Sequence, residues 1–324
     1  MILLTARPAS TTTSMLGEGP VWDEARGCLL WVDIPAAEVH EGRLEGDQVV
    51  TTRTHRLADV TDTVGAVAPA TDGRLLVAGH RSLIVLDRET GRCDTLQAIG
   101  SEVRSRLNDG ACDPAGRFLV GTLALDDRTG NESLLRLEDD GVVTVVDADL
   151  TLANGLAWSP DGRLLYSVDS VPGVVWARDY DTASGRTGPR HALVRVADGL
   201  PDGLCVDADG GLWLAVWGAG QVRRFSPDGE LTAVVEVPAP HTTSAAFIGA
   251  DRSTLLITTA RSELSAAELA RYPDSGRNFV VDVGVPGLPT TPWNGESRRF
   301  TPLRAASDDP SPDPSCSTPD RPVT

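Results

Sequence analysis

Short apolar stretches follow turns rich in Asp, Gly and Pro, and this arrangement recurs six times along the 324-residue chain. Typical copies are ATDGRLLVAGH from Ala70, DPAGRFLVGTL from Asp113 and SPDGRLLYSVD from Ser159. The first apolar residues after the six turns lie 43 to 48 residues apart: Leu29, Leu75, Phe118, Leu164, Leu212 and Leu255. Six near-equal units of this length predict an all-β, six-bladed propeller, because one four-stranded blade has a period of about 45 residues.

Helical periodicity is nearly missing from the chain. The one short segment with apolar residues at helical spacing is SAAELARY, around Ala266. Other apolar runs, such as Val142–Val146 and Phe279–Val283, are short, β-branched and bounded by Gly, Asp or Pro, which is typical of strands. Two packed β-sandwiches are an alternative fold, but they would not require six near-equal units.

The end of the chain has a different composition. From Arg304 onward, Asp and Ser alternate with five prolines, and almost nothing apolar remains to be buried: Pro310, Pro312, Pro314, Pro319 and Pro322. Such a segment cannot offset the entropy lost on ordering. We therefore place the propeller in residues 1–293 and predict a disordered tail in residues 294–324.

Charge and composition exclude several classes of function. The formal net charge of −17 argues against binding to nucleic acid or anionic membranes. All 29 basic residues are arginine, which excludes Schiff-base enzymes and Walker-type phosphate loops, since both need a lysine amine. The cysteines form no CxxC pair, and the apolar run at the amino terminus is too short for a secretory signal. We expect a cytoplasmic protein with no membrane segment and no obligate protein partner.

Oxygen-bearing side chains recur ten or eleven residues before the apolar stretch of four units: Glu18, Asn108, Asn154 and Asp202. The innermost strands of a propeller line one channel, so equivalent positions converge on its axis. Buried carboxylates there would repel each other unless a cation neutralised them. The pattern predicts a site for Ca²⁺, Mg²⁺ or Mn²⁺, with Zn²⁺ also compatible. A single Asn or Asp before Gly is more often a turn residue, but four in register favour the metal.

Two further residues are candidates for contact with a substrate. Arg106 precedes Asn108 by two positions, so the two side chains share one face of an extended strand. An arginine beside a metal centre can donate several hydrogen bonds to substrate oxygens, although a surface role is the alternative. Asp126 follows the strand of the same unit and is within reach of the same mouth, with a solvated turn before Arg128 as its alternative.

The blocks LGEGPVWDEARGCLLWVDI, RLNDGACDPAGRFLVGTL, ANGLAWSPDGRLLY and PDGLCVDADGGLW resemble the family of senescence marker protein 30, gluconolactonase and regucalcin. The resemblance continues through TTSAAF and SGRNFVVDVGVPGLP, and covers about residues 14–290. It implies a six-bladed propeller with one catalytic divalent metal, whose ligands are Glu18, Asn154 and Asp202. It also implies that Arg106 and Asn108 bind the substrate. Asp126 stands where the family often has a Glu, one methylene longer.

The leading hypothesis is a metal-dependent lactonase that opens a sugar-acid lactone to the aldonic acid, with Ca²⁺ as the expected cation. In it, Asp202 is both a metal ligand and the catalytic base that takes the proton of the attacking water. Three rivals remain: a phosphoester or fluorophosphate hydrolase, a calcium-binding regulatory propeller without turnover, and a protein-binding platform. The complete ring with Arg106 beside it favours catalysis.

Overall fold

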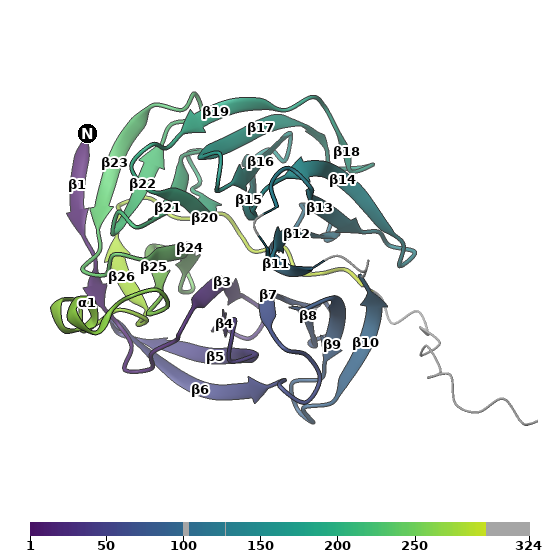
Figure 1. Ribbon diagram of the computed structural model, residues 1–324, viewed down its shortest axis with the longest axis horizontal. Coiled ribbons are helices and arrows are strands. Elements are labelled where there is room, and N and C mark those ends of the chain that lie inside the picture. Colours follow the sequence, from purple (N-terminus) through teal and green to yellow (C-terminus); the bar gives the residue numbers. More distant parts are fainter. Residues whose placement is uncertain (100–103, 127, 296–324) are drawn as a thin grey trace, which may run out of the picture.

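The computed structural model describes residues 1–99, 104–126 and 128–295, which form six β-sheets around a central channel (Figure 1). The prediction of an all-β, six-bladed propeller is therefore confirmed.

In blades 1 to 3 the strands follow the sequence from the axis outward. Blade 1 contains β3 (Gly17–Asp23), β4 (Cys28–Asp33), β5 (Glu38–Glu45) and β6 (Gln48–Arg56). Blade 2 contains β7 (Val64–Pro69), β8 (Leu75–Gly79), β9 (Ser82–Leu86) and β10 (Cys93–Ala98), and blade 3 contains β11 (Ser105–Cys112), β12 (Phe118–Ala124), β13 (Glu132–Leu137) and β14 (Val143–Leu150).

The remaining blades follow the same plan with small additions. Blade 4 contains β15 (Ala153–Trp158), β16 (Leu164–Asp169) and β17 (Val174–Asp181), with β18 (Arg186–Thr187) and β19 (His191–Arg195) both paired to β17. Blade 5 contains β20 (Leu200–Val206), β21 (Leu212–Trp217), β22 (Gln221–Phe225) and β23 (Leu231–Glu236). Blade 6 contains β24 (Thr242–Ile248), β25 (Thr254–Thr259) and β26 (Phe279–Asp282).

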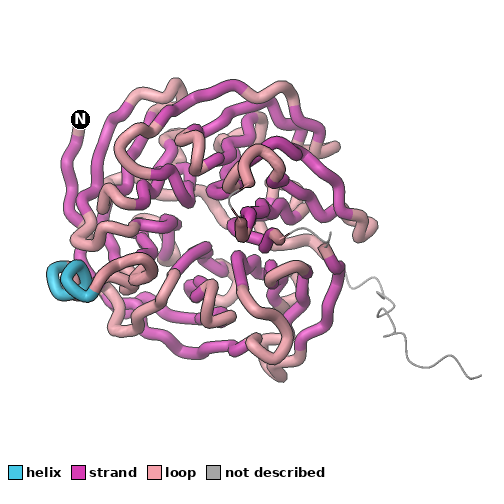
Figure 2. Tube along the Cα trace, in the orientation of Figure 1, coloured by secondary structure: helices cyan, strands magenta, loops and turns pink. Residues whose placement is uncertain are grey.

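The amino-terminal segment closes the ring. Strand β1 (Ile2–Thr5) pairs in parallel with β23 on the outside of blade 5, and β2 (Arg7–Pro8) pairs with β26 as the outermost strand of blade 6. Because these pairings join residues more than 200 positions apart, one short segment ties together two neighbouring blades. Helix α1 (Ala266–Arg271) lies at the rim near this closure (Figure 2), where Ser265 and Glu268 form a capping box.

The recurring turn is held by its aspartate. In blade 3, Asp113 Oδ1 accepts hydrogen bonds from the backbone N–H groups of Ala115 and Arg117, each at 2.9 Å. In blade 5, Asp207 Oδ1 does the same for Asp209 and Gly211. These bonds satisfy the backbone groups of a tight turn, which explains why Asp recurs at the start of each apolar stretch.

Apolar side chains pack between neighbouring blades rather than in one central core. Each interface has its own buried cluster, such as the one between blades 6 and 1 that contains Trp22, Trp31, Leu256 and Val280. The channel axis is therefore left to other side chains. No helix in the described ranges is both long and apolar enough to cross a membrane.

The channel has two distinct ends. We call the end where the innermost strands begin the proximal end, and the end where they finish the distal end. After β26, residues 284–295 run across the distal end as a strap (yellow in Figure 1). Asn294, assigned to the tail by composition, donates a hydrogen bond to Ala115 O at 2.8 Å. The rest of the predicted tail, from residue 296, lies outside the described residues.

A buried ion network joins blades 1 and 2. Arg88 donates to Asp23 Oδ2 at 2.5 Å and to Glu41 Oε2 at 2.7 Å, and its side chain is almost fully buried. His55 Nε2 lies 2.7 Å from Glu41 Oε1. Burial raises the pKa of Glu41, but the bonds from His55 and Arg88 outweigh this effect and bring the pKa to about 2.

Replacing Arg88 should destabilise the protein strongly, because Arg88→Met would leave two buried carboxylates without their cation. We expect a loss of about 3–5 kcal/mol in the free energy of unfolding, measured by urea titration. The matched control is Arg92→Met, which removes an exposed pair with Asp94 and should cost less than about 1 kcal/mol. Similar losses in both variants would contradict a structural role for the network.

Candidate metal and lactone site

Four predicted site residues lie at the proximal part of the channel, each on an innermost strand. The side chains are buried, with 6% of their surface exposed: Glu18 on β3, Asn108 on β11, Asn154 on β15 and Asp202 on β20. The equivalent positions on β7 and β24 are occupied by Gly65 and the hydroxyl of Ser244.

A β-bulge places these residues. In all six innermost strands the pairing register with the second strand shifts at this level, for example between Glu18 and Val21 and between Asn154 and Leu156. A bulge bends the strand and re-aims its side chains. Its repetition in every blade turns the equivalent positions toward one region of the axis.

Glycine next to the ring residues allows the innermost strands to approach each other. A Cβ atom on Gly155 would lie 2.6 Å from Asp202 O, and one on Gly203 would lie 2.1 Å from Ser244 Oγ. Both contacts are far shorter than any Cβ tolerates. In each Asn-Gly or Asp-Gly pair, the first residue therefore supplies a candidate oxygen ligand. The glycine allows the neighbouring strands to pack closely.

Burial and neighbouring negative charge raise the pKa of both ring carboxylates. Burial, and then the nearby charge of Asp109, raise the pKa of Glu18 to about 8. Burial and the charges of Glu18 and Asp109 raise the pKa of Asp202 well above its usual value. Negative charge is therefore crowded at the axis. This is the state expected of two buried carboxylates that no cation neutralises.

Asp109 is the site residue that the sequence pattern missed. Strict strand alternation places it on the face opposite Asn108, but the bulge between Leu107 and Gly110 interrupts that alternation, and the charge of Asp109 acts on Glu18 and Asp202. Burial raises the pKa of Asp109 to about 6. The hydrogen bond that Gly110 N–H donates to Asp109 Oδ1, at 2.8 Å, acts in the opposite direction and lowers this pKa. The sequence Asn-Asp-Gly at a bulge was the signal that could have revealed it.

Arg106 faces the same group of carboxylates. Its Nη1 donates to Asn108 Oδ1 at 2.8 Å and to Leu107 O at 2.9 Å, so the predicted pairing of these two side chains is present. Burial lowers the pKa of Arg106 to about 10, while the charges of Glu18 and Asp202 act in the opposite direction. Asn108 Nδ2 donates in turn to Ala153 O at 3.0 Å, which holds the Arg106–Asn108 pair in place.

Asp126 is the one predicted substrate contact that has a different partner. Its Oδ1 accepts from Arg128 Nε at 2.6 Å, and 38% of its side chain is exposed. Arg128 Nη2 also lies 3.2 Å from Glu132 Oε1. Asp126 is thus at the proximal mouth, tied to a neighbouring cation, rather than among the buried ring residues.

Two buried oxygens at the ring have no hydrogen-bond donor among residues 1–99, 104–126 and 128–295. They are Asn154 Oδ1 and Asp202 Oδ1, whereas Asn154 Nδ2 donates to Ser170 Oγ at 3.2 Å. A buried acceptor without a partner is costly, and a cation removes that cost. Across the described ranges, no three His, Cys, Asp or Glu side chains are grouped to hold a metal. The donor set that fits is therefore two carboxylates with an amide oxygen, which suits a hard divalent cation.

Several known proteins are similar to this chain in sequence and in fold. The family model described as "SMP-30/Gluconolactonase/LRE-like region" matches residues 16–261. Regucalcin of Danio rerio is 34% identical over 286 residues, 86% of this chain and 95% of that protein. The 6-deoxy-6-sulfogluconolactonase of Pseudomonas putida is 36% identical over 280 residues, 85% of this chain and 93% of that protein. The crystal structure of a calcium-binding protein, regucalcin, from Agrobacterium tumefaciens has a TM-score of 0.84 at 31% identity, covering 90% of this chain and 98% of that one.

The charge crowding predicts how the stability of metal-free protein depends on pH. The pKa of Glu18 is raised from 4.5 to about 8 in the folded state, so the unfolded chain ionises first and stability falls as pH rises between these values. Glu18→Gln should remove this loss and stabilise the chelator-treated protein by at least about 1 kcal/mol at pH 8.

The measurement is the melting temperature of chelator-treated protein between pH 5 and pH 9. Glu89→Gln, at an exposed carboxylate, is the control and should leave the profile unchanged. A Glu18→Gln variant that is less stable than the parent at pH 8 would show that the ring carboxylates do not repel each other.

Proposed function

The chain belongs to the SMP-30/gluconolactonase/LRE-like family, and from that membership we propose that it hydrolyses a sugar-acid lactone with a divalent cation bound at the ring. Its relatives include a lactonase that is 36% identical over most of both chains, and the chain is accordingly a lactone-hydrolysing enzyme. The observation that carries the site assignment is the pair of buried, unpartnered oxygens on Asn154 and Asp202, beside the crowded carboxylates. The product is the open aldonic acid.

The predicted ligands of the cation are Glu18, Asn154 and Asp202. A divalent cation held there would act as a Lewis acid toward the lactone carbonyl. Ca²⁺ is the leading candidate, because the donors are oxygens and the similar Agrobacterium tumefaciens protein is described as calcium-binding. Asp109, which adjoins the ring, adds negative charge that favours any divalent cation.

Arg106 orients the substrate. Within the described residues, Nη1 of its guanidinium donates both hydrogen bonds. Nε and Nη2 can therefore donate to hydroxyl or carbonyl oxygens of the substrate. Asn108 holds Arg106 through its Oδ1, and the second hydrogen on its Nδ2 can reach the sugar. Asp126, paired with Arg128 at the mouth, would contact only the outer end of the sugar. Fixed donors of this kind make a weak nucleophile effective by holding the lactone in position.

Asp202 is the proposed general base. Its carboxylate accepts a proton from water as the water oxygen attacks the carbonyl carbon, and returns that proton to the ring oxygen as the C–O bond breaks. Burial beside Glu18 and Asp109 raises the proton affinity of this carboxylate, which suits the task. The atoms balance, since one water is consumed and the lactone gains one carboxyl and one hydroxyl group.

A calcium-binding propeller without turnover is the second candidate, and the description of the Agrobacterium tumefaciens protein favours it. One assay separates the two. Chelator-treated protein is reconstituted with Ca²⁺, Mg²⁺, Mn²⁺ or Zn²⁺ and tested on five- and six-carbon aldonolactones, beginning with glucono-1,5-lactone, with acid release followed by a pH indicator. We expect turnover that requires the metal. Calorimetric Ca²⁺ binding without turnover on any lactone would favour the regulatory propeller.

Asp202→Asn keeps a ligating oxygen but removes the basicity and one negative charge. We expect kcat to fall by about 10²-fold or more at saturating metal, because hydroxide formation still needs a proton acceptor. The measurement is kcat at a metal concentration that calorimetry shows to fill the site of the variant.

Glu18→Gln is the matched control, since it removes one ring charge without removing the base. It should weaken metal affinity but retain most of kcat once the site is filled. Near-parental kcat in Asp202→Asn under the same conditions would make Asp202 a ligand only.

A further inference from the structure

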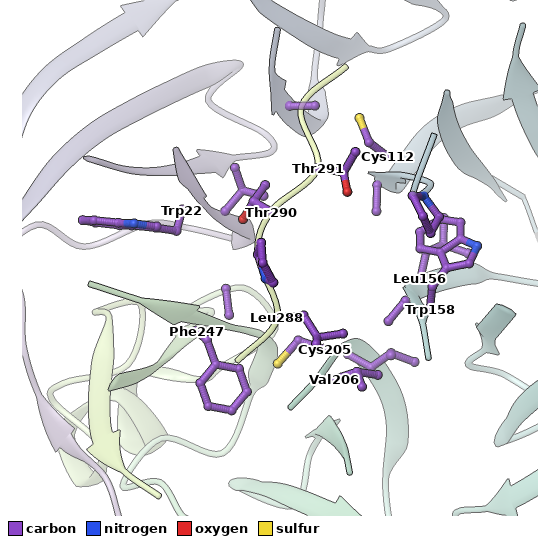
Figure 3. Close-up of a pocket in the computed structure, with 18 of the residues that line it drawn as sticks. Trp22, Cys112, Leu156, Trp158, Cys205, Val206, Phe247, Leu288, Thr290 and Thr291 are labelled. Atoms are coloured by element: carbon purple, nitrogen blue, oxygen red, sulfur yellow. The ribbon is translucent and has the colours of Figure 1, made fainter. Parts of the chain in front are cut away.

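The distal end of the channel contains a cavity of about 520 Å³. It lies between the final halves of the innermost strands and the strap, as Figure 3 shows. Its walls include Gly19 and Asp109, so it reaches the underside of the ring, but Glu18, Arg106, Asn154 and Asp202 are not among them. It is therefore a separate compartment from the lactone site, at the other end of the same channel.

The walls of this distal cavity are mostly apolar. All six blades contribute to the lining, which includes large aromatic and aliphatic side chains and two thiols: Trp22, Leu156, Trp158, Phe247, Cys112 and Cys205. The only charged side chains in the described lining are Asp109 and Asp161, both acidic. Five hydroxyl-bearing residues supply the uncharged polar part of the described lining: Ser159, Thr182, Ser244, Thr290 and Thr291. Such walls disfavour anions and offer a few hydrogen bonds to an apolar molecule.

The strap forms one wall of the cavity and is fixed at its two ends. Gly287 N donates to Arg252 O at 2.9 Å, and Trp293 N donates to Pro69 O at 2.8 Å. Between these anchors, residues 288–292 make no backbone hydrogen bond within the described structure. Leu288, Thr290 and Thr291 instead face the cavity (Figure 3). This wall can shift to fit a molecule without breaking a ladder of hydrogen bonds.

We propose that the distal cavity is a second binding site, for a neutral, apolar small molecule such as an aromatic compound. Its volume is within the range of about 300–1,000 Å³ that ligand sites occupy. Water against the Trp158, Leu156 and Phe247 side chains forms few hydrogen bonds, so its release by an apolar ligand is favourable. The site does not depend on the lactonase assignment.

The test uses N-phenyl-1-naphthylamine, a neutral aromatic probe that fluoresces in apolar surroundings. Titration of the full chain should give a saturable rise in emission with one probe per protein. Cys205→Trp and Cys112→Trp place a large side chain in the cavity, and each should weaken probe binding by about tenfold or more. Cys93→Trp is the matched control, because Cys93 lies on the outermost strand of blade 2, away from the cavity. Circular dichroism and melting curves report whether each variant folds.

A second measurement needs no variant. Burial raises the pKa of both the Cys112 and Cys205 thiols, so N-ethylmaleimide is applied at alkaline pH and the modified cysteines are identified by mass spectrometry. Bound probe should slow modification of Cys112 and Cys205 and leave Cys93 unaffected. Equal probe binding by the Cys93 and Cys205 variants would overturn the proposal. Bound probe that failed to protect Cys112 and Cys205 from modification would overturn it as well.

Discussion

Repulsion among carboxylates buried at the axis is the constraint around which the channel is organised. Beyond the effect of burial, the charge of Asp109 raises the pKa of Glu18, and the charges of Glu18 and Asp109 raise that of Asp202. The charge of Arg106 acts in the opposite direction on both carboxylates. An arrangement of this cost persists only when the surrounding structure holds it in place. Here that structure is the tight approach of six innermost strands, each bulged at the same level and several relieved of a Cβ by glycine.

The stability that holds the ring in place comes from elsewhere in the molecule. Apolar clusters between blades, the buried Arg88 network and the strands β1 and β2 that close the ring all lie away from the axis. The axis therefore does not need to contribute packing energy. It can contain polar groups without partners because the interfaces between blades stabilise the fold independently.

The sequence predicted the architecture because each blade repeats a local signal. The aspartate that binds its own turn, followed by a short apolar strand, is visible in every unit, and the position of the ring follows by counting back from it. Asp109 was missed because a bulge overrides the alternation of side chains, and the Asn-Asp-Gly sequence that accompanies the bulge is also common in ordinary turns. The pairing of β1 with β23 was equally hidden, since it joins segments that are more than 200 residues apart. Likewise, the bond between Asp126 and Arg128 could not be foreseen from the strand pattern, and the role of Asp126 as a sugar contact stays a prediction.

The same strands give the two ends of the channel opposite chemistry. Strand β15 passes from Asn154 at the ring to Trp158 at the distal end, and β20 passes from Asp202 to Val206. Each change occurs within five residues, about 17 Å of extended chain at most. The buried hydrogen-bonding side chains of the ring lie at the proximal end, where Arg106 faces the ring carboxylates. An apolar molecule loses nothing at the distal end, where the walls offer few competing bonds to water. The same set of strands therefore presents a polar, charged surface at the ring and a mostly apolar surface at the distal end.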